Sequence, residues 1–325
     1  MALTPPYVAI LDVGHGNSTV IKDGTETVIV DCGSGKSDLL EFLTTEKINI
    51  VNTIFLSHSD VDHIGGLLPV FSSPDIKVNS VIVNADATKG SKLWDDLTYE
   101  LSHSSDVQFI VGISNETGKF KCGAIELQVV GPTGYLASKG AGGKDRKGRE
   151  ITSNSISASF HVYWKGQSIA YLAGDIDQVG LDDLVDHEVS LKTTALVFPH
   201  HGGKSGNGDI VDFTKQLCDL TSPSTVIFSI GRNKHDNPRP EIVNTVRKTV
   251  DGIRIACTQF SKNCIKVVPS GPQAHLVNTY SKGKEMDHCC GGTFVINLTK
   301  DGAQNMPDQA LHKIFITNHA TSPLC

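Results

Sequence analysis

The chain has 325 residues, of which 39% are hydrophobic and 20% charged, a composition typical of a globular protein and unlike disordered, collagen-like or coiled-coil chains. Its net charge of −6 gives no general attraction to nucleic acid or to an anionic membrane, so a polyanionic partner requires a local basic patch. No apolar run approaches the ~18 residues of a spanning helix, and the first residues lack the pattern of a signal peptide. These features predict a cytoplasmic protein with no membrane partner.

Strand and helix patterns alternate along the first 250 residues. Short β-branched runs predict strands at 8–13, 27–32, 52–57, 80–85, 107–112, 124–131, 156–164, 168–174, 195–200 and 225–231. Longer amphipathic runs predict helices at 37–47, 63–71, 92–102, 177–187, 209–218 and 241–250. The alternation predicts an α/β protein whose helices cover the faces of its sheets.

Two segments depart from this alternation. Residues 138–150 contain four glycines and five Lys or Arg against two acids, which predicts a mobile basic loop. After residue 255 short strands are predicted at 264–269, 275–280, 293–298 and 313–318, with no further helix. We therefore expect one large α/β domain over 1–255 and a β-rich, cysteine-containing extension over 256–325.

The cysteines of the extension have two interpretations. The chain has eight cysteines, too few for a disulfide scaffold, and five of them lie in the last 69 residues. Their thiolates could form a closed zinc site, but the spacings differ from those usual for zinc. Packing of buried cysteines under the extension is the preferred interpretation.

The sequence SHSDVDHIGG, directly after the strand at 52–57, carries the strongest chemical signal. In an extended segment His58, Asp60 and Asp62 point to one side, and His63 joins them as the chain turns into the next helix. Burying two carboxylates together costs several kcal/mol unless cations compensate them. The motif therefore predicts a metal centre, as opposed to a polar loop capped by Asp62.

Two later strands end in further candidate ligands. Asp175 follows the strand at 168–174 and suits a carboxylate that bridges two ions, whereas Asp177 is expected to cap the next helix. His200 and His201 end the strand at 195–200. Adjacent residues of an extended segment face opposite ways, so one of the two is expected to bind metal directly and the other either to orient substrate or to support the ligands from behind.

These carboxylates and imidazoles are enough for two divalent ions in one cleft. Such a pair would activate a water and stabilise the oxyanion formed on a phosphoryl or acyl centre, so no side-chain nucleophile is needed. The chain has no Gly-x-Ser-x-Gly elbow to supply one.

In these motifs the chain resembles the metallo-β-lactamase superfamily, in particular the branch of the hydrolase domain of ComEC-type competence DNA-uptake proteins. The His-x-Asp-x-Asp-His motif at 58–63 is the variant of that branch, and its other elements recur in order: LDVGHGNSTVI with VDCGSG, Asn154 with Ser155, the Gly-Asp at Asp175, HHGGKS, and SIGRNKHDNPRPE. The resemblance covers about residues 7–260. It implies an αββα sandwich, with metals at one sheet edge and hydrolysis by a metal-bound hydroxide.

The chain departs from the branch at two places. Asn237 stands where the branch usually carries His before Pro, so either His235 takes over that role or the step is weakened. His15 and Asn17 replace the usual Gln and Asp, which we expect to alter the cleft floor but not the ligand set. Asp60 in place of His gives the first site an oxygen ligand that is harder than an imidazole nitrogen, so Mn²⁺ is as plausible as Zn²⁺.

The motifs and the resemblance together assign the site. The predicted metal ligands, for two Zn²⁺ or Mn²⁺ ions, are His58, Asp60, Asp62, His63, Asp175, His200 and His201. The predicted catalytic residues are Asp60, Asp62, His201 and His235. The predicted substrate-binding residues are Asn154, Ser155, Lys204, Asn233 and Asn237.

Three functions are compatible with this site. The preferred one is a metal-dependent phosphodiesterase or nuclease acting on nucleic acid, supported by the branch, by the basic residues of 138–150 and by Lys204, which follows His200 and His201 closely in the sequence. The second is a hydrolase of a small molecule such as a phosphorylated headgroup, cyclic nucleotide or lactone, which the acidic net charge favours. The third is a regulatory module without turnover. The sequence identifies no protein partner.

Overall fold

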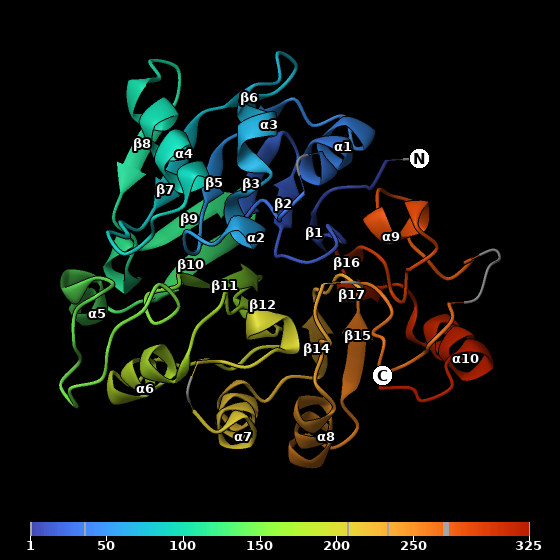
Figure 1. Ribbon diagram of the computed structural model, residues 1–325. Coiled ribbons are helices and arrows are strands. Elements are labelled where there is room, and N and C mark those ends of the chain that lie inside the picture. Colours follow the sequence, from blue (N-terminus) through green and yellow to red (C-terminus); the bar gives the residue numbers. More distant parts are fainter. Residues whose placement is uncertain (1, 36, 207, 233, 269–272, 325) are drawn as a thin grey trace.

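The computed structural model describes residues 2–324 except 36, 207, 233 and 269–272. Two sheets form its centre (Figure 1). The first has the strand order β17-β16-β1-β2-β3-β5-β7-β8. Its strands are β1 (Tyr7–Ile10), β2 (Thr19–Asp23), β3 (Glu26–Val30), β5 (Thr53–Phe55), β7 (Ser80–Val83), β8 (Gln108–Val111), β16 (Phe294–Thr299) and β17 (Gly302–Met306).

The second sheet has the order β15-β14-β13-β12-β11-β10-β9. Its strands are β9 (Lys119–Cys122), β10 (Ile125–Gly131), β11 (Ser159–Trp164), β12 (Gln167–Leu172), β13 (Ala195–Val197), β14 (Thr225–Phe228) and β15 (Arg254–Cys257). A two-stranded ladder joins β4 (Ile50–Val51) and β6 (Lys77–Val78). The strands from β12 to β15 are parallel, as are β3, β5, β7 and β8, so each sheet collects several carboxyl ends at one edge.

Helices cover the outer face of each sheet. Figure 1 shows α1, α3 and α4 on the side of the first sheet and α6, α7 and α8 on the side of the second. The helices are α1 (Asp38–Thr45), α2 (Val61–Ile64), α3 (Leu67–Phe71), α4 (Lys92–His103), α5 (Gly134–Lys139), α6 (Gln178–Asp186), α7 (Ile210–Thr221), α8 (Pro240–Thr249), α9 (Lys282–Glu285) and α10 (Gln309–His319). The fold is an αββα sandwich.

Alternation of side chains along buried strands builds the layers. In β1, Val8 and Ile10 join the core between the two sheets, whereas Tyr7 and Ala9 join the core under α1, α3 and α4. Successive residues of a strand point to opposite faces, and a sheet covered on both sides is apolar on both. This explains why the predicted strands are continuous apolar runs.

The strands and helices predicted before residue 251 are present, except that the one helix predicted at 63–71 is two short helices, α2 and α3. The strands β2, β4 and β6 were not predicted. Asp177 caps α6, as predicted, by accepting hydrogen bonds from the backbone N–H groups of Val179 and Gly180. The sequence patterns missed β9, because Lys119–Cys122 is a short edge strand with two exposed lysines. They also missed α5, a helix of six residues.

The prediction that no helix follows residue 255 is wrong. The run at 313–318, predicted as a strand, lies within α10, which begins after the cap Asp308. His312 and Ile316 are its buried residues, four positions apart, so the helical period explains the pattern that was taken for a strand. Residues 264–268 and 275–280 contain no strand, whereas 293–298 forms most of β16.

The C-terminal residues are joined to the first sheet and to the loop after β1. β16 pairs antiparallel with β1. The fully buried carboxylate of Asp12 accepts hydrogen bonds from Gln259 Nε2 (2.8 Å), Ser281 Oγ (2.7 Å) and the Gly283 N–H (2.8 Å). A buried carboxylate is stable only when donors surround it in this way. The division at residue 255 stays a prediction.

The basic segment 138–150 is held by contacts in the structure. The guanidinium of Arg149 bonds Asp145 (2.7 Å) and Asp182 (2.6 Å), and Lys147 lies 3.6 Å from Asp182. Arg146 lies over the ring of Tyr135. Several of its cations are thus already partnered, and the mobility of the segment stays a prediction.

Across the described residues, every helix is too short or too polar to span a bilayer. The cytoplasmic location stays a prediction.

Candidate metal centre

The candidate ligands follow strands of both sheets. His58 comes after β5, Asp175 after β12, and His200 and His201 after β13. Asp62 and His63 lie in the short helix α2, which begins directly after Asp60. Because the carboxyl ends of parallel strands meet at one sheet edge, residues up to 140 positions apart in the sequence converge there.

His58, His63 and Asp175 form what we call the buried group. One ligand atom of each lies within 4.8 Å of the others. Nε2 of His63 is 3.5 Å from Oδ1 of Asp175, and Nε2 of His58 is 3.9 Å from Oδ2. All three side chains are buried, and neither Nε2 atom has a hydrogen-bond partner among the described residues. Such unpaired buried atoms are costly, so the group fits a divalent ion.

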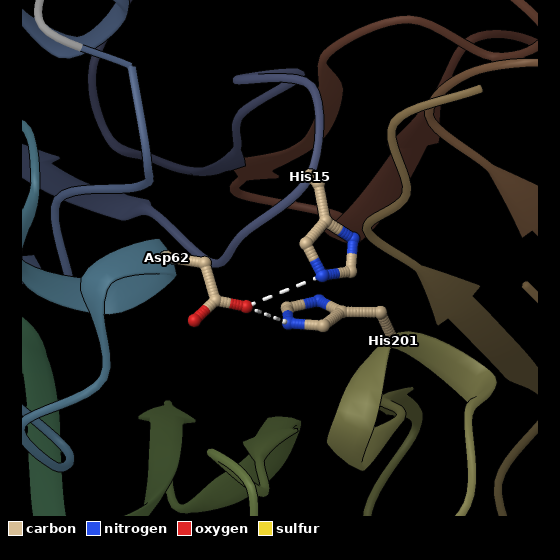
Figure 2. Close-up of side chains that lie close together, drawn as sticks. All are labelled: His15, Asp62 and His201. Carbon is tan, nitrogen blue, oxygen red and sulfur yellow. Dashed lines mark hydrogen bonds and ion pairs between the residues drawn. The ribbon is translucent and has the colours of Figure 1, made fainter. Parts of the chain in front are cut away.

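His15, Asp62 and His201 form a second set, which we call the cleft group. Figure 2 shows both imidazoles pointing at one carboxylate. Nε2 of His15 is 3.3 Å from Oδ2 of Asp62, and Nε2 of His201 is 3.2 Å from the same oxygen. The two groups are neighbours, since the ring centroids of His63 and His201 are 5.6 Å apart. His15 was not among the predicted ligands.

Both His200 and His201 face the centre, so the expectation that they point in opposite directions is wrong. They lie in the turn η2 (Pro199–Gly202) with φ of 52° and 54°. Opposite faces are a property of extended backbone, and these residues are in the left-handed region, which costs about 1–3 kcal/mol each. His201 joins the cleft group, and Nδ1 of His200 lies 3.5 Å from Oδ2 of Asp175.

Asp60 lies at the edge of the centre. Its Oδ2 is 3.8 Å from Nε2 of His58, but its Oδ1 accepts a hydrogen bond from the ammonium of Lys89. It belongs to neither group of mutually close ligands. Lys89 lies in the loop between β7 and α4, and nothing in the sequence indicated that it contacts Asp60.

Asp31 positions His63. It follows β3, and its Oδ2 accepts a hydrogen bond from Nδ1 of His63 (2.7 Å) and from the Ser57 hydroxyl (2.8 Å). Its Oδ1 accepts from the Ser57 N–H (2.7 Å). A carboxylate on one ring nitrogen directs the other nitrogen toward a metal and fixes the tautomer.

The electrostatics of the metal-free centre favour cation binding. Burial lowers the pKa of His58 to about 4, so its ring is neutral at pH 7. Burial alone would raise the pKa of Asp175, but His63 and His200 lower it well below its usual range. Burial alone would lower the pKa of His63, but Asp31 and Asp175 raise it well above 6.5. Metal binding at the buried group should therefore release the proton of His63.

Replacing Asp31 by Asn should weaken metal binding. Asn keeps the shape but loses the charge that orients His63, and losing such a partner typically costs ~10–100-fold in affinity. Competition with a chelating dye measures the dissociation constant. Asp183→Asn, which removes a buried carboxylate far from the centre, should leave it unchanged, and equal affinities for Asp31→Asn and wild type would contradict the assigned role.

Replacing Lys89 by Met should strengthen binding at the buried group by about tenfold, because the change removes a cation beside the centre and frees Asp60. The gain is modest because both side chains are about one third exposed and solvent screens the charge. Lys92→Met, which removes an exposed lysine paired with Asp96, is the control. Weaker metal binding by Lys89→Met than by wild type would show that Lys89 helps to build the site.

The other predicted residues divide into two sets. His235, Lys204 and Asn237 line a cleft of about 530 Å³ that opens beside the cleft group. Asn154 and Ser155 do not line it, and the Ser155 hydroxyl donates to the cap Asp177 (2.7 Å). Asn233 lies outside the described residues.

Two further residues contact the ligands. The Asn237 amide donates to the carbonyl of His200 (3.4 Å), so it supports the turn that carries both histidines. Ser157 accepts from the Asp175 N–H (3.0 Å) and lies 3.4 Å from Nδ1 of His58. Its position in an Asn-x-x-Ser pattern with Asn154 was the sequence signal for it.

The cysteines take no part in either group. Neither set of mutually close ligands found in the described residues contains a cysteine, and Cys257, Cys264, Cys289 and Cys290 are buried. Packing under the C-terminal segment remains the preferred interpretation.

The chain is similar to several known proteins. ComE operon protein 3 of Bacillus subtilis (strain 168) is 22% identical over 262 residues, which cover 74% of this chain and 30% of that protein. The chain thus spans less than a third of that relative. The solved metallo-β-lactamase fold protein YhfI of Bacillus subtilis is 11% identical, with a TM-score of 0.48 over 78% of this chain and 97% of that one.

A diphosphatase of the PhnP family is 16% identical, with a TM-score of 0.44 over 74% of this chain and 81% of that one. Human tRNase Z, short form, is 14% identical, with a TM-score of 0.40 over 70% and 94%. Residues 11–217, more than half of the chain, match the family described as the metallo-beta-lactamase superfamily. Since the family model matches more than half of the chain, and the matched segment contains both ligand groups, the chain belongs to the metallo-β-lactamase superfamily.

Proposed function

We propose that the protein is a metal-dependent phosphodiesterase that cleaves nucleic acid. One observation carries the proposal: the two ligand groups adjoin a cleft whose wall carries Lys204 and Arg239. A phosphodiester is an anion, and an anion that reaches the centre would meet these cations beside it. The resemblance of the motifs to the ComEC-type branch supports nucleic acid as the substrate.

The residues of the cleft would have different roles in the hydrolysis of a phosphodiester. Two divalent ions at the centre would activate a water and neutralise charge that develops on the phosphoryl group. The ammonium of Lys204 would orient the phosphate, and Arg239, whose Nη1 bonds Glu241 (3.4 Å) at the same wall, would offer its remaining guanidinium donors. His235 lies at the rim with its ring 4.5 Å from that of His15, within reach of a leaving oxygen that needs a proton.

We propose Zn²⁺ for both positions. The prediction that Mn²⁺ is as plausible was based on Asp60 as a ligand, but Lys89 binds that carboxylate. Each group of mutually close ligands then has two imidazoles and one carboxylate. Imidazole-rich sets of this kind suit Zn²⁺, and three protein ligands are typical of catalytic zinc.

The test is an assay of the purified full chain, loaded with Zn²⁺ or Mn²⁺, on single-stranded DNA, double-stranded DNA, RNA and bis(p-nitrophenyl) phosphate. Cleavage of a nucleic acid by wild type, lost in Asp62→Asn and retained in Asp212→Asn, would support the proposal. Asp212 is exposed in the first turn of α7 and belongs to neither ligand group. Hydrolysis of the small diester without cleavage of any nucleic acid would refute the substrate assignment.

A small-molecule substrate is the second candidate. Several cations of 138–150 are engaged by Asp145, Asp182 and Tyr135, so the segment offers less free positive charge than the sequence suggests. The two candidates differ in salt dependence, because binding to a nucleic acid backbone weakens steeply with salt. A panel of lactones, cyclic nucleotides and phosphorylated headgroups tests the second candidate directly.

A further inference from the structure

We propose that His15 is a metal ligand, so that the cleft-facing ion is held by His15, Asp62 and His201. The inference depends on the proposed function only in taking the centre to bind metal, and it is independent of the substrate. The residue lies in the loop after β1, more than 40 positions before the motif that begins at His58.

The distances within the cleft group fit coordination. Zinc ligands lie about 2.0–2.2 Å from the ion, so two ligand atoms of a tetrahedral site are roughly 3.4 Å apart. Nε2 of His15 and Nε2 of His201 are 3.3 Å and 3.2 Å from Oδ2 of Asp62. Figure 2 shows the two rings on the same side of that oxygen, where a single ion could contact both nitrogens.

Without His15 the second position lacks a third ligand. His63 is committed elsewhere, because Nδ1 bonds Asp31 and Nε2 faces Asp175 in the buried group. Only Asp62 and His201 would remain, and catalytic sites of this kind use three protein ligands. His15 supplies the missing nitrogen from the loop after β1.

The backbone fixes the loop that carries His15. Gly16 packs so closely on the carbonyl of Asp62 that a Cβ at residue 16 would lie 2.2 Å from that oxygen, and the Asn17 N–H donates to the same carbonyl (3.2 Å). Gly231 packs against the His15 N–H, where a Cβ would lie only 2.3 Å away. The loop and Asp62 are therefore held together by main-chain contacts, independent of the imidazole.

The two positions differ in access. All three members of the cleft group line the 530 Å³ cleft, whereas His58 and His63 do not. The ion that His15 helps to hold would therefore be the one that substrate meets and the one that exchanges faster with a chelator. His15 stands where the branch usually carries Gln, and the consequence of this replacement would be an additional nitrogen ligand for the cleft-facing ion.

Metal stoichiometry tests the proposal. Full-length wild type, His15→Gln and His235→Gln are dialysed against buffered Zn²⁺ and analysed for bound zinc. His235 is a matched control, because its ring also contacts that of His15 but lies outside the group. We expect two ions in wild type and His235→Gln, and a second ion at least about tenfold weaker in His15→Gln. Two ions of unchanged affinity in His15→Gln would overturn the proposal.

A spectroscopic variant covers the case in which His15→Gln does not fold. His15→Cys loaded with Co²⁺ should show a thiolate-to-cobalt charge-transfer band that is absent from Co²⁺-loaded wild type, because only direct coordination produces it. A folded, cobalt-loaded His15→Cys protein without the band would count against the proposal. If wild type itself binds no divalent ion, the proposed metal-dependent function fails. If the protein binds two ions whose affinities do not change when residue 15 is replaced, this inference alone is refuted.

Discussion

Replacing Asp175 by Asn should abolish hydrolysis and release the buried ion. The carboxylate of Asp175 lies within 3.5–3.9 Å of ring nitrogens of His58, His63 and His200. Asn removes its negative charge while keeping its size, so the imidazoles lose the anion around which they are arranged. We expect a loss of about 4 kcal/mol in transition-state stabilisation, or roughly 10³-fold in kcat/KM.

The measurement is kcat/KM on the best diester substrate together with the zinc content of the same preparation. Asp177→Asn is the matched control, two residues further along the chain. Asn keeps the cap of α6, but its amide nitrogen cannot accept the hydrogen bond from the Ser155 hydroxyl, so the replacement should cost about 1 kcal/mol of stability and leave zinc content unchanged. An Asp175→Asn enzyme with wild-type zinc and wild-type rate would show that this carboxylate does not organise the centre.

The parts of the site that the sequence predicted are those encoded locally. His58, Asp62 and His63 fall within six residues directly after a strand, so the period of an extended segment and the following turn bring them together. Asp175 likewise follows the last residues of a buried strand. For the residues of one motif the distance along the chain is a fair guide to the distance in space, whereas Asp175 was found from its place at the end of a strand.

The residues that were missed depend on contacts between remote segments. His15 meets Asp62 and His201, and Lys89 meets Asp60, only because loops from different strands end at the same edge. No spacing encodes these pairs. The paired orientation of His200 and His201 was missed for another reason, because it requires two consecutive residues in the left-handed region, which local preferences disfavour for histidine.

In the C-terminal segment, too, contacts between remote residues determine a feature that the local sequence did not predict. The run at 313–318 has the β-branched and aromatic residues of a strand, yet it forms part of α10. Its neighbour His312 is buried against His275 and Cys290, contacts that a strand in this place would not make. Tertiary packing therefore makes this segment helical although its local propensity favours a strand.

That packing predicts a stability that falls in acid. Burial, with contributions from His275 and Arg254, lowers the pKa of His312 to about 3, whereas a histidine in the unfolded chain titrates near 6.5. Between these values the unfolded chain binds a proton that the folded chain excludes, so stability rises with pH and is lost as the pH falls below about 6.5. From pH 7 to pH 4.5 the loss should be about 2–3 kcal/mol.

Urea denaturation of the metal-free protein at the two pH values measures this loss, and His312→Gln isolates the contribution of His312 from that of the metal ligands. Gln cannot take up the proton, so the variant should lose about 2–3 kcal/mol less than wild type over the same interval. His319→Gln removes an exposed histidine of the same helix, whose ring is solvated before and after unfolding, and should follow wild type. If His312→Gln also follows wild type, the acid sensitivity arises elsewhere, and α10 is not held by a neutral buried imidazole.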